Sequence, residues 1–187
     1  MQGDVAASAA DFSLSSAGKI ELKNKISAKN NISVQSSSTQ HQDLLLKGAL
    51  SAENILLGDE SKKNFNIDID RGSVYAANRL DVSGHHLNAN QANIQSKATA
   101  DLNIAESVKL DRSHIDTADL NINALEMTAD TSQLVASKNI KINTQTDLLM
   151  QQSDLQAKHA SALTVDHGNI RIDEGILKAD QELSLSA

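Results

Sequence analysis

The chain lacks cysteine, proline and tryptophan, and its only aromatic residues are Phe12, Phe65 and Tyr75. Without cysteine it has no disulfide framework, no thiol nucleophile and no cysteine-ligated zinc site. An ordinary globular enzyme uses proline in its loops and aromatic rings in its core, so this composition disfavours that class. The longest apolar runs, such as 44–46 and 55–57, are far shorter than the ~20 residues that cross a bilayer as a helix.

Positive charge is also scarce. The 187 residues include 17 Lys and Arg against 24 Asp and Glu, which gives a formal net charge of −7 at pH 7. Nucleic-acid binding needs clustered basic residues that displace counterions from phosphates, so we expect no nucleic-acid partner. The start, Met1-Gln2-Gly3-Asp4, has no basic segment leading into an apolar one. If the protein is exported, we therefore expect its export signal to lie outside this fragment.

Alternation of apolar and polar residues with a period of two dominates the sequence. Typical units are Ile67-Asp68-Ile69, Leu102-Asn103-Ile104 and Ile140-Lys141-Ile142. On a β-strand the two apolar side chains of such a unit point to one side and the polar one to the other. A helix needs apolar residues three and four apart over a longer window, and no run of useful length has that spacing. The sequence therefore predicts an all-β protein.

These units belong to a longer motif, in which apolar-x-Ala precedes apolar-x-apolar by a few polar residues. Copies begin at Ile26, Leu50, Val74, Leu87, Ile115 (with Thr in the small position), Leu134, Leu155 and Leu177. From Ile115 onward the copies are 19, 21 and 22 residues apart. A period near 20 with short strands and polar turns is typical of a solenoid. The first half is less regular, with 24 residues between Ile26 and Leu50 and 13 between Val74 and Leu87.

Stacking explains why such a chain would form a parallel β-helix. One coil cannot bury its apolar side chains alone, but stacked coils bury them in columns, each strand pairing with the next ~4.8 Å away. Alanine suits an inward position beside a corner, where a larger side chain would crowd the narrow interior. We expect Asn and Asp at the corners, because they tolerate left-handed backbone geometry. Proline is missing because the ladders need most backbone N–H groups.

Two polar segments interrupt the repeat, at residues 36–43 and 58–64. We expect both to be loops that leave the coil of a single β-helical domain spanning residues 1–187. Loops that leave a solenoid can carry recognition, so the region 36–100 is where we expect a binding face.

Several repeats resemble those of a known family. They include Leu50-Ser51-Ala52-Glu53-Asn54-Ile55, residues 134–142 and residues 177–187. These resemble filamentous haemagglutinin-type repeats of large exoproteins in Gram-negative two-partner secretion systems, including contact-dependent growth inhibition effectors (CdiA-like). The resemblance covers roughly residues 10–187. It implies a right-handed, single-stranded parallel β-helix within a long surface stalk.

The same resemblance implies location and partners. The stalk would be exported unfolded through an outer-membrane transporter and would be secreted or held at the cell surface. The chain would be a fragment of a larger exoprotein, and we expect it to be monomeric. A target-cell surface receptor, protein or glycan, would be its other partner.

The six histidines are the first candidates for chemistry: His41, His85, His86, His114, His159 and His167. The pair His85-His86 can chelate a metal only if it lies in a turn, because adjacent strand residues point to opposite faces. We interpret all six as solvated turn residues and expect no metal or cofactor.

Two acidic groups are the second candidates. Asp68 and Asp70 flank Ile69 and share one strand face, as catalytic carboxylates do in β-helical polysaccharide lyases and hydrolases. Asp166, Asp173 and Glu174 lie near His167 in the sequence. Aligned acids on an outward β face are more often simply solvated, and aromatic platforms that usually line a sugar groove are missing. Phosphate-loop, nucleophile-elbow and zinc-protease motifs are missing too, so we expect no catalytic residues.

Three functions follow from these observations. The first is a non-catalytic structural or adhesive shaft of a secreted filamentous exoprotein that presents an adhesin or toxin. The second is a receptor-binding segment of a contact-dependent growth inhibition effector. The third is a section of a β-helical carbohydrate-active enzyme or phage tailspike. The sequence does not assign receptor-binding residues.

Overall fold

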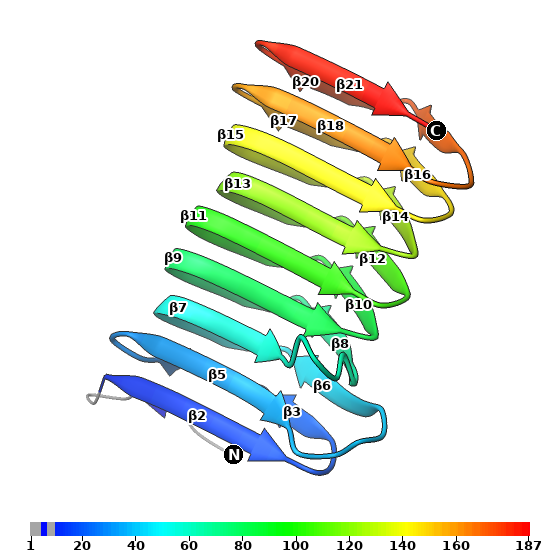
Figure 1. Cartoon of the computed structure of the whole chain (residues 1–187). Helices are drawn as coiled ribbons and strands as arrows, with labels where there is room; N and C mark the ends of the chain where they lie inside the picture. Colours follow the sequence, from blue (N-terminus) through cyan, green and yellow to red (C-terminus); the bar gives the residue numbers. More distant parts are fainter. Residues whose placement is uncertain (1–4, 7–9) are drawn as a thin grey trace.

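The computed structural model describes residues 5–6 and 10–187, and over these ranges the chain forms only strands, turns and bends. The strands follow one another around a single axis as a stack of coils (Figure 1). The prediction of an all-β solenoid is therefore confirmed. The strands are β1 (Val5–Ala6), β2 (Asp11–Ser16), β3 (Ile20–Leu22), β4 (Ile26–Ser27), β5 (Asn31–Ser36), β6 (Gln42–Leu46), β7 (Ala49–Gly58), β8 (Phe65–Asp70), β9 (Ser73–Gly84), β10 (His86–Asn90), β11 (Asn93–Ile104), β12 (Ser107–Asp111), β13 (His114–Ala124), β14 (Glu126–Asp130), β15 (Gln133–Thr144), β16 (Leu148–Gln151), β17 (Asp154–Ala157), β18 (Ala160–Val165), β19 (Ile170–Asp173), β20 (Ile176–Ala179) and β21 (Glu182–Ser186).

Each coil contributes strands to two parallel sheets. The large sheet has 13 strands and runs from β1 and β2 to β20 and β21, and the small sheet has eight strands and runs from β3 to β19. In the middle coils one long strand, such as β11 or β13, supplies both segments of the large sheet, and the pairing between these two strands shifts register at a bend in their middle. In the outer coils two shorter strands replace it, such as β4 with β5 and β17 with β18.

The apolar residues of successive coils lie directly above one another and fill the interior. One column contains Leu50, Val74, Ile94, Ile115, Leu134 and Leu155. None of these side chains is more than 1% exposed. The predicted spacing from Ile115 to Leu177 is confirmed, because these residues pair in register coil after coil.

A second inward column holds the small residues of the motif. It contains Ala52, Ala76, Ser96, Thr117, Ala136 and Ala157, all buried. The column lies beside the bend of the long strands, as predicted for alanine. The two hydroxyl residues use the bend carbonyls: Ser96 Oγ donates to Asn78 O and Thr117 Oγ1 donates to Ala98 O, at 2.9 and 3.2 Å.

The predicted irregular spacing in the first half is wrong at one copy of the motif. Val74 pairs with Ile94, not with Leu87, so the period there is 20 residues. Leu87 instead belongs to the small sheet, where it pairs with Ile67 and Val108. The segment Leu87-Asn88-Ala89 has the apolar-x-Ala pattern because Ala89 also points inward, from a different side of the coil.

The predicted role of Asn and Asp at left-handed corners is also wrong. The described non-glycine residues with positive φ are Lys63, Arg71, Gln91, Arg112, Thr131, Gln152 and Glu174, with φ between 45° and 54°. All but Lys63 occupy one corner, where the small sheet leads into the next coil. A buried serine follows this corner in three coils: Ser113 N donates to Ser132 Oγ and Ser132 N donates to Ser153 Oγ, both at 3.0 Å. The serines satisfy backbone donors that the turn leaves unpaired.

The two polar segments leave the coil at the opposite corner. Residues 37–41 connect β5 to β6, and residues 59–64 connect β7 to β8. The segments contact each other, because Gln42 N donates to Asn64 O at 2.8 Å and Lys62 Nζ donates to Ser36 O at 3.5 Å. Gly58 opens the second loop with a φ of 92°, and a Cβ there would overlap the Ser83 carbonyl, so only glycine fits.

We predict that Ile140→Asp destabilises the chain far more than Lys141→Asp. Ile140 is 1% exposed within the stack, whereas Lys141 points outward from the same strand. Burying an unpaired carboxylate should cost more than about 3 kcal/mol, and the surface change should stay within about 0.5 kcal/mol. Thermal unfolding followed by circular dichroism measures both, and equal shifts in melting temperature would contradict the assigned facing.

Candidate binding surfaces

Outward residues also line up from coil to coil, and many form polar ladders. Asn143 Nδ2 donates to Asn123 Oδ1 at 2.8 Å, and Asn123 Nδ2 donates to Asn103 Oδ1 at 3.0 Å. Beside this ladder, Asn121 Nδ2 donates to Asp101 Oδ1 at 2.7 Å. This is the role of many Asn and Asp residues: they pair across coils on the outer face. Ladders of this kind use side-chain amides for stacking and leave few of them for a ligand.

The strongest charge contacts on the large sheet centre on Arg79. Its Nε lies 2.8 Å from both carboxylate oxygens of Asp81, and its Nη2 lies 2.8 Å from Asp81 Oδ1 and from Asp101 Oδ2. Hydrogen bonds to Asp81 are the main cause that raises the pKa of Arg79. The charges of Asp81, Asp101 and Glu60 raise it further, while burial lowers it. The arrangement ties β9 to β11 across the outer face.

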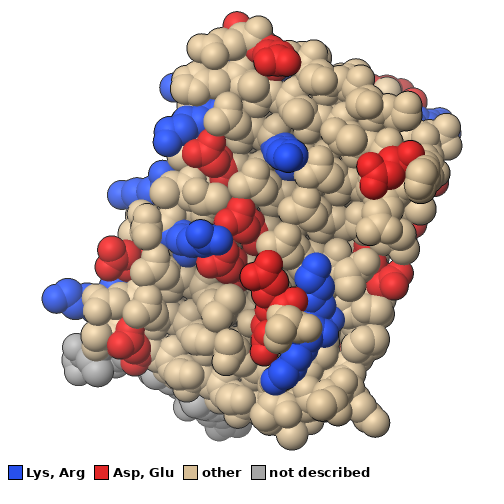
Figure 2. Space-filling view, viewed as in Figure 1, with Lys and Arg blue, Asp and Glu red and all other residues tan. Residues whose placement is uncertain are grey.

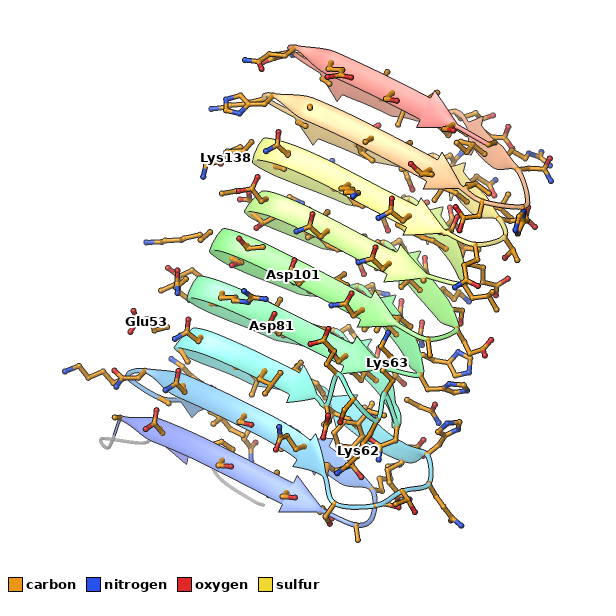
Figure 3. The ribbon with its side chains drawn as sticks, in the orientation of Figure 1. Glu53, Lys62, Lys63, Asp81, Asp101 and Lys138 are labelled. Atoms are coloured by element: carbon orange, nitrogen blue, oxygen red, sulfur yellow. The ribbon has the colours of Figure 1, made fainter. Side chains whose placement is uncertain are left out.

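The loop 59–64 places further charges beside this cluster. Figure 2 shows basic and acidic side chains on this face, and Figure 3 shows Asp81 and Asp101 on neighbouring strands, with Lys63 and Lys62 lower in the view on the loop. Lys62 Nζ lies 3.6 Å from Asp59 Oδ2, an exposed pair within the loop. Asp59 also accepts hydrogen bonds from the backbone and side chain of Ser61, at 2.9 and 2.6 Å, which lowers its pKa. The loop is therefore held by polar contacts, both within itself and with residues 36–42, rather than by an apolar core.

Three histidine rings pack together where the two loops leave the coil. The rings of His41 and His85 stack with centroids 3.8 Å apart, and the rings of His85 and His86 meet edge to face at 4.3 Å. His41 belongs to loop 37–41, whereas His85 forms the bend between β9 and β10. His86 Nδ1 lies 2.9 Å from Ser107 Oγ in the next coil. The cluster thus links loop 37–41, which precedes β6, to the start of β10, which lies two coils further along the stack.

Electrostatics favour the neutral form of His85. Burial is the main cause that lowers the pKa of His85, and the neighbouring His41 and His86 lower it further, while Glu106 opposes them. Two imidazolium rings cannot stack at this distance without strong repulsion. Protonation of His85 therefore opposes the contact between its ring and that of His41.

A hollow of about 320 Å³ lies on the small sheet beside the histidines. It is lined by Lys19, Asp43, Leu44, Leu45, Asn66, Ile67, Asp68, His86 and Asn88. Burial is the main cause that raises the pKa of Asp68, and Asp70 and Asp43 raise it further against Lys47 and Lys19. The lining therefore combines a partly desolvated carboxylate with amide groups, an imidazole and the half-buried Leu45.

Asp68 and Asp70 share one face of β8, as predicted, but they do not line this hollow together. Asp70 lies outside it, where it accepts a hydrogen bond from Asn90 Nδ2 at 3.1 Å and lies 3.5 Å from Arg71 Nε. Asn88 Nδ2 approaches Asp68 Oδ1 at 3.4 Å. Each carboxylate thus joins its own column of polar side chains.

The second acidic group is not assembled by the fold. His167 precedes β19, whereas Asp173 is its last residue and Glu174 follows it. Asp173 pairs with Arg171, whose Nε lies 2.6 Å from Asp173 Oδ2, and Glu174 accepts from Gln152 Nε2 at 2.8 Å. Asp166 and His167 instead bond through their backbone N–H groups to the preceding coil.

The remaining sequence candidates are dispersed. His114 begins β13 and His159 lies in the turn before β18. Over residues 5–6 and 10–187, no three His, Asp or Glu side chains are placed to hold a metal ion. Phe65 is fully buried and Phe12 packs against the core. Tyr75 is not a core residue: it points outward from β9, with Lys97 Nζ 6.0 Å from its ring centroid, beside a hollow of about 370 Å³.

Sequence reasoning missed the histidine stack. It treated His41 and His85 separately because 44 positions divide them. The available signal was their placement at the same corner of the repeat, two coils apart. It was hidden because the unequal loops disturb the apparent period in this half of the chain.

We predict that acid loosens loop 37–41. The pKa of His85 is lowered in the folded state, so the opened loop binds the proton more tightly than the closed loop. The contribution of neutral His85 to the stability of the closed loop is therefore complete above its ordinary pKa of 6.5 and is lost as the pH falls below that value. Amide hydrogen exchange at residues 37–41, corrected for its intrinsic pH dependence, should be faster at pH 5.5 than at 7.5.

The variant His41→Phe is the matched control, because it keeps an aromatic ring on His85 and removes a neighbour that lowers the pKa of His85. It should raise the pKa of His85 toward its ordinary value and reduce the pH dependence of exchange. Equal protection of the wild-type loop at both pH values would refute the assigned role of the stack.

Comparisons with known proteins add no relative to this description. A scan of protein-family models gives no match, and neither curated proteins nor solved structures give one. None of the described residues belongs to a helix that could cross a membrane. The assignment of a β-solenoid rests on the strand pairing and the buried apolar columns of this chain.

Proposed function

We propose that the chain is a non-catalytic shaft segment of a secreted filamentous exoprotein, which presents an adhesin or toxin at the surface of a Gram-negative bacterium. The observation that supports this proposal most directly is the repetition of one coil around a continuous apolar interior. Each coil offers the next one the same set of inward columns and backbone ladders. Further coils can be added to such a stack along its axis, which suits a spacer.

The contacts between neighbouring coils also suit a shaft that carries load along its axis. Neighbouring coils are joined by backbone ladders in both sheets and by side-chain ladders such as Asn103-Asn123-Asn143. In a solenoid, stability is close to a sum of coil terms and neighbour-interface terms. Each added coil therefore lengthens the shaft by repeating the same contacts with its neighbour.

The composition fits the proposed export through an outer-membrane transporter partner. A chain without cysteine needs no disulfide to form before or after passage. A chain without proline has no slow prolyl isomerisation step when it refolds outside the cell. Parallel coils can then stack one after another as the chain emerges.

We predict that one whole coil can be removed. Deletion of residues 115–133 joins His114 to Leu134, and Leu134 then takes the column position of its register partner Ile115. The product should fold and its long axis should shorten by about 4.8 Å. Circular dichroism and small-angle scattering measure these two properties.

Deletion of residues 115–132 is the matched control. It removes one residue fewer, so the alternation shifts by one and the apolar side chains of β15 turn outward. This variant should unfold at a clearly lower temperature than the in-phase deletion. Similar stability of the two deletions would count against an interchangeable coil and hence against the shaft.

A receptor-binding segment is the second candidate, and a specific observation favours it. The loops 37–41 and 59–64, the histidine stack and the hollow beside Asp68 all lie within coils of the first half. This is the part of the chain where the sequence predicted a binding face. In this function the shaft carries the recognition site on its side, for a protein or glycan on a target cell.

Binding of the labelled chain to Gram-negative cells tests this candidate. Saturable binding that is lost in Asp68→Lys, which reverses the charge in the hollow, would support it. The control is Lys141→Asp, an outward change on the large sheet that should leave binding unchanged. Absence of saturable binding, or equal loss in both variants, would remove the candidate and leave the plain shaft.

A further inference from the structure

One coil in the middle of the stack has a shorter bend than its neighbours. In β13 only Ala118 lies between the two paired segments, whereas two residues lie there in the adjoining strands, 97–98 in β11 and 137–138 in β15. The bends follow one edge of the stack, where Figure 3 labels Glu53 and Lys138. The missing residue leaves a notch between the two longer bends, lined by the buried Ala118.

The notch opens into a groove on the outer face of the large sheet. It belongs to a hollow of about 370 Å³ that is lined by Tyr75, Gln95, Ser96, Lys97, Asp116, Thr117, Ala118 and Ser137. A second hollow, of about 360 Å³, shares Asp116 and Ser137 with the first and extends to Val135 and Gln156. The two hollows therefore form one continuous groove.

This groove runs parallel to the axis of the stack and has a regular spacing. Each of five successive coils contributes one outward residue in register: Tyr75, Gln95, Asp116, Val135 and Gln156. Successive coils lie ~4.8 Å apart, which is close to the length of one hexopyranose unit in an extended sugar chain. An extended peptide advances only about 3.3 Å per residue, so its residues fall out of step with the coils.

The polar side chains of the groove are not used by the protein itself. Among the described residues, the side chains of Gln95, Asp116 and Gln156 make no hydrogen bond or ion pair with another residue. On the neighbouring segment of the same sheet, by contrast, the amide groups of Asn123 and Asn143 are joined in a ladder. The groove thus presents free amide and carboxylate groups where the ladder presents bonded ones.

We infer that this groove binds a linear oligosaccharide, which lies parallel to the axis with one sugar unit on each coil. The ring of Tyr75, half-buried and outward, offers an apolar surface against which the C–H face of a pyranose ring packs. The amides of Gln95 and Gln156 donate and accept hydrogen bonds, and the carboxylate of Asp116 accepts them from neighbouring hydroxyl groups. This combination of one aromatic ring with amide and carboxylate groups fits a polyhydroxylated ligand.

One contact within the protein competes with this ligand. Lys97 Nζ lies 6.0 Å from the centroid of the Tyr75 ring. Lys97 is exposed, so its side chain can move aside without loss of packing and then donate to sugar hydroxyl groups. A cation–π contact at an exposed site is weak, and its loss costs the bound state little.

Isothermal titration calorimetry of the 187-residue chain tests the inference with cellohexaose, chitohexaose and mannohexaose, whose β-linked chains are extended. At least one of them should bind, and its affinity should rise with each unit from the disaccharide to the pentasaccharide and change little beyond it. Maltohexaose, whose α-linked chain is curved, should bind more weakly. Failure of all three extended hexasaccharides to bind, or an affinity that does not depend on chain length, would overturn the inference.

The short bend offers a matched pair of variants. Insertion of one serine after Ala118 gives β13 a bend as long as its neighbours' and fills the notch, so it should abolish binding. The control is insertion of one serine after Glu53, which lies in the equally short bend of β7 and lines neither hollow. Both variants should unfold near the wild-type temperature, and the control should bind as the wild type does. Equal loss of binding in both would contradict the groove.

Substitutions of Tyr75 test the site without changing the backbone. Tyr75→Ala should weaken binding about tenfold, since it removes the aromatic surface. Tyr75→Phe keeps that surface and should retain most of the affinity. Unchanged affinity in Tyr75→Ala would show that the sugar binds elsewhere.

The inference goes beyond the proposed shaft and concerns a different sheet from the hollow beside Asp68. Asp68→Lys should therefore leave hexasaccharide binding unchanged. If the chain tolerates deletion of residues 115–133 but the wild-type chain binds none of the hexasaccharides, the shaft stands and the groove is refuted.

Discussion

The parallel pairing of each coil with the next is the interaction on which the rest of the structure depends. A coil has no interior of its own, since its apolar side chains are buried only by the coils above and below. The strand spacing fixes these columns in register, so a leucine such as Leu134 lies against Ile115 on one side and Leu155 on the other. Every other feature of the molecule is placed relative to this register.

The same register organises the outer surface. Side chains one coil apart are close enough to bond, and the chain uses Asn and Asp to connect them. This explains why a protein rich in carboxylates and amides assembles no metal-binding cluster in the described residues: most of these groups serve their neighbours in the column. The loops 37–41 and 59–64 and the histidines beside them interrupt this register, so polar groups there face solvent or one another.

The sequence by itself determined the solenoid class, the inward direction of units such as Ile140-Lys141-Ile142 and the place of alanine beside the bend. Strand alternation and the repeat depend on neighbouring residues, so they can be read along the chain. Only the tertiary structure decided that Leu87 belongs to a different sheet from Val74, that serines rather than Asn or Asp support the left-handed corner, and that His41 stacks on His85. These features depend on which residues the winding brings together across coils, and loops of unequal length conceal that distance in the sequence.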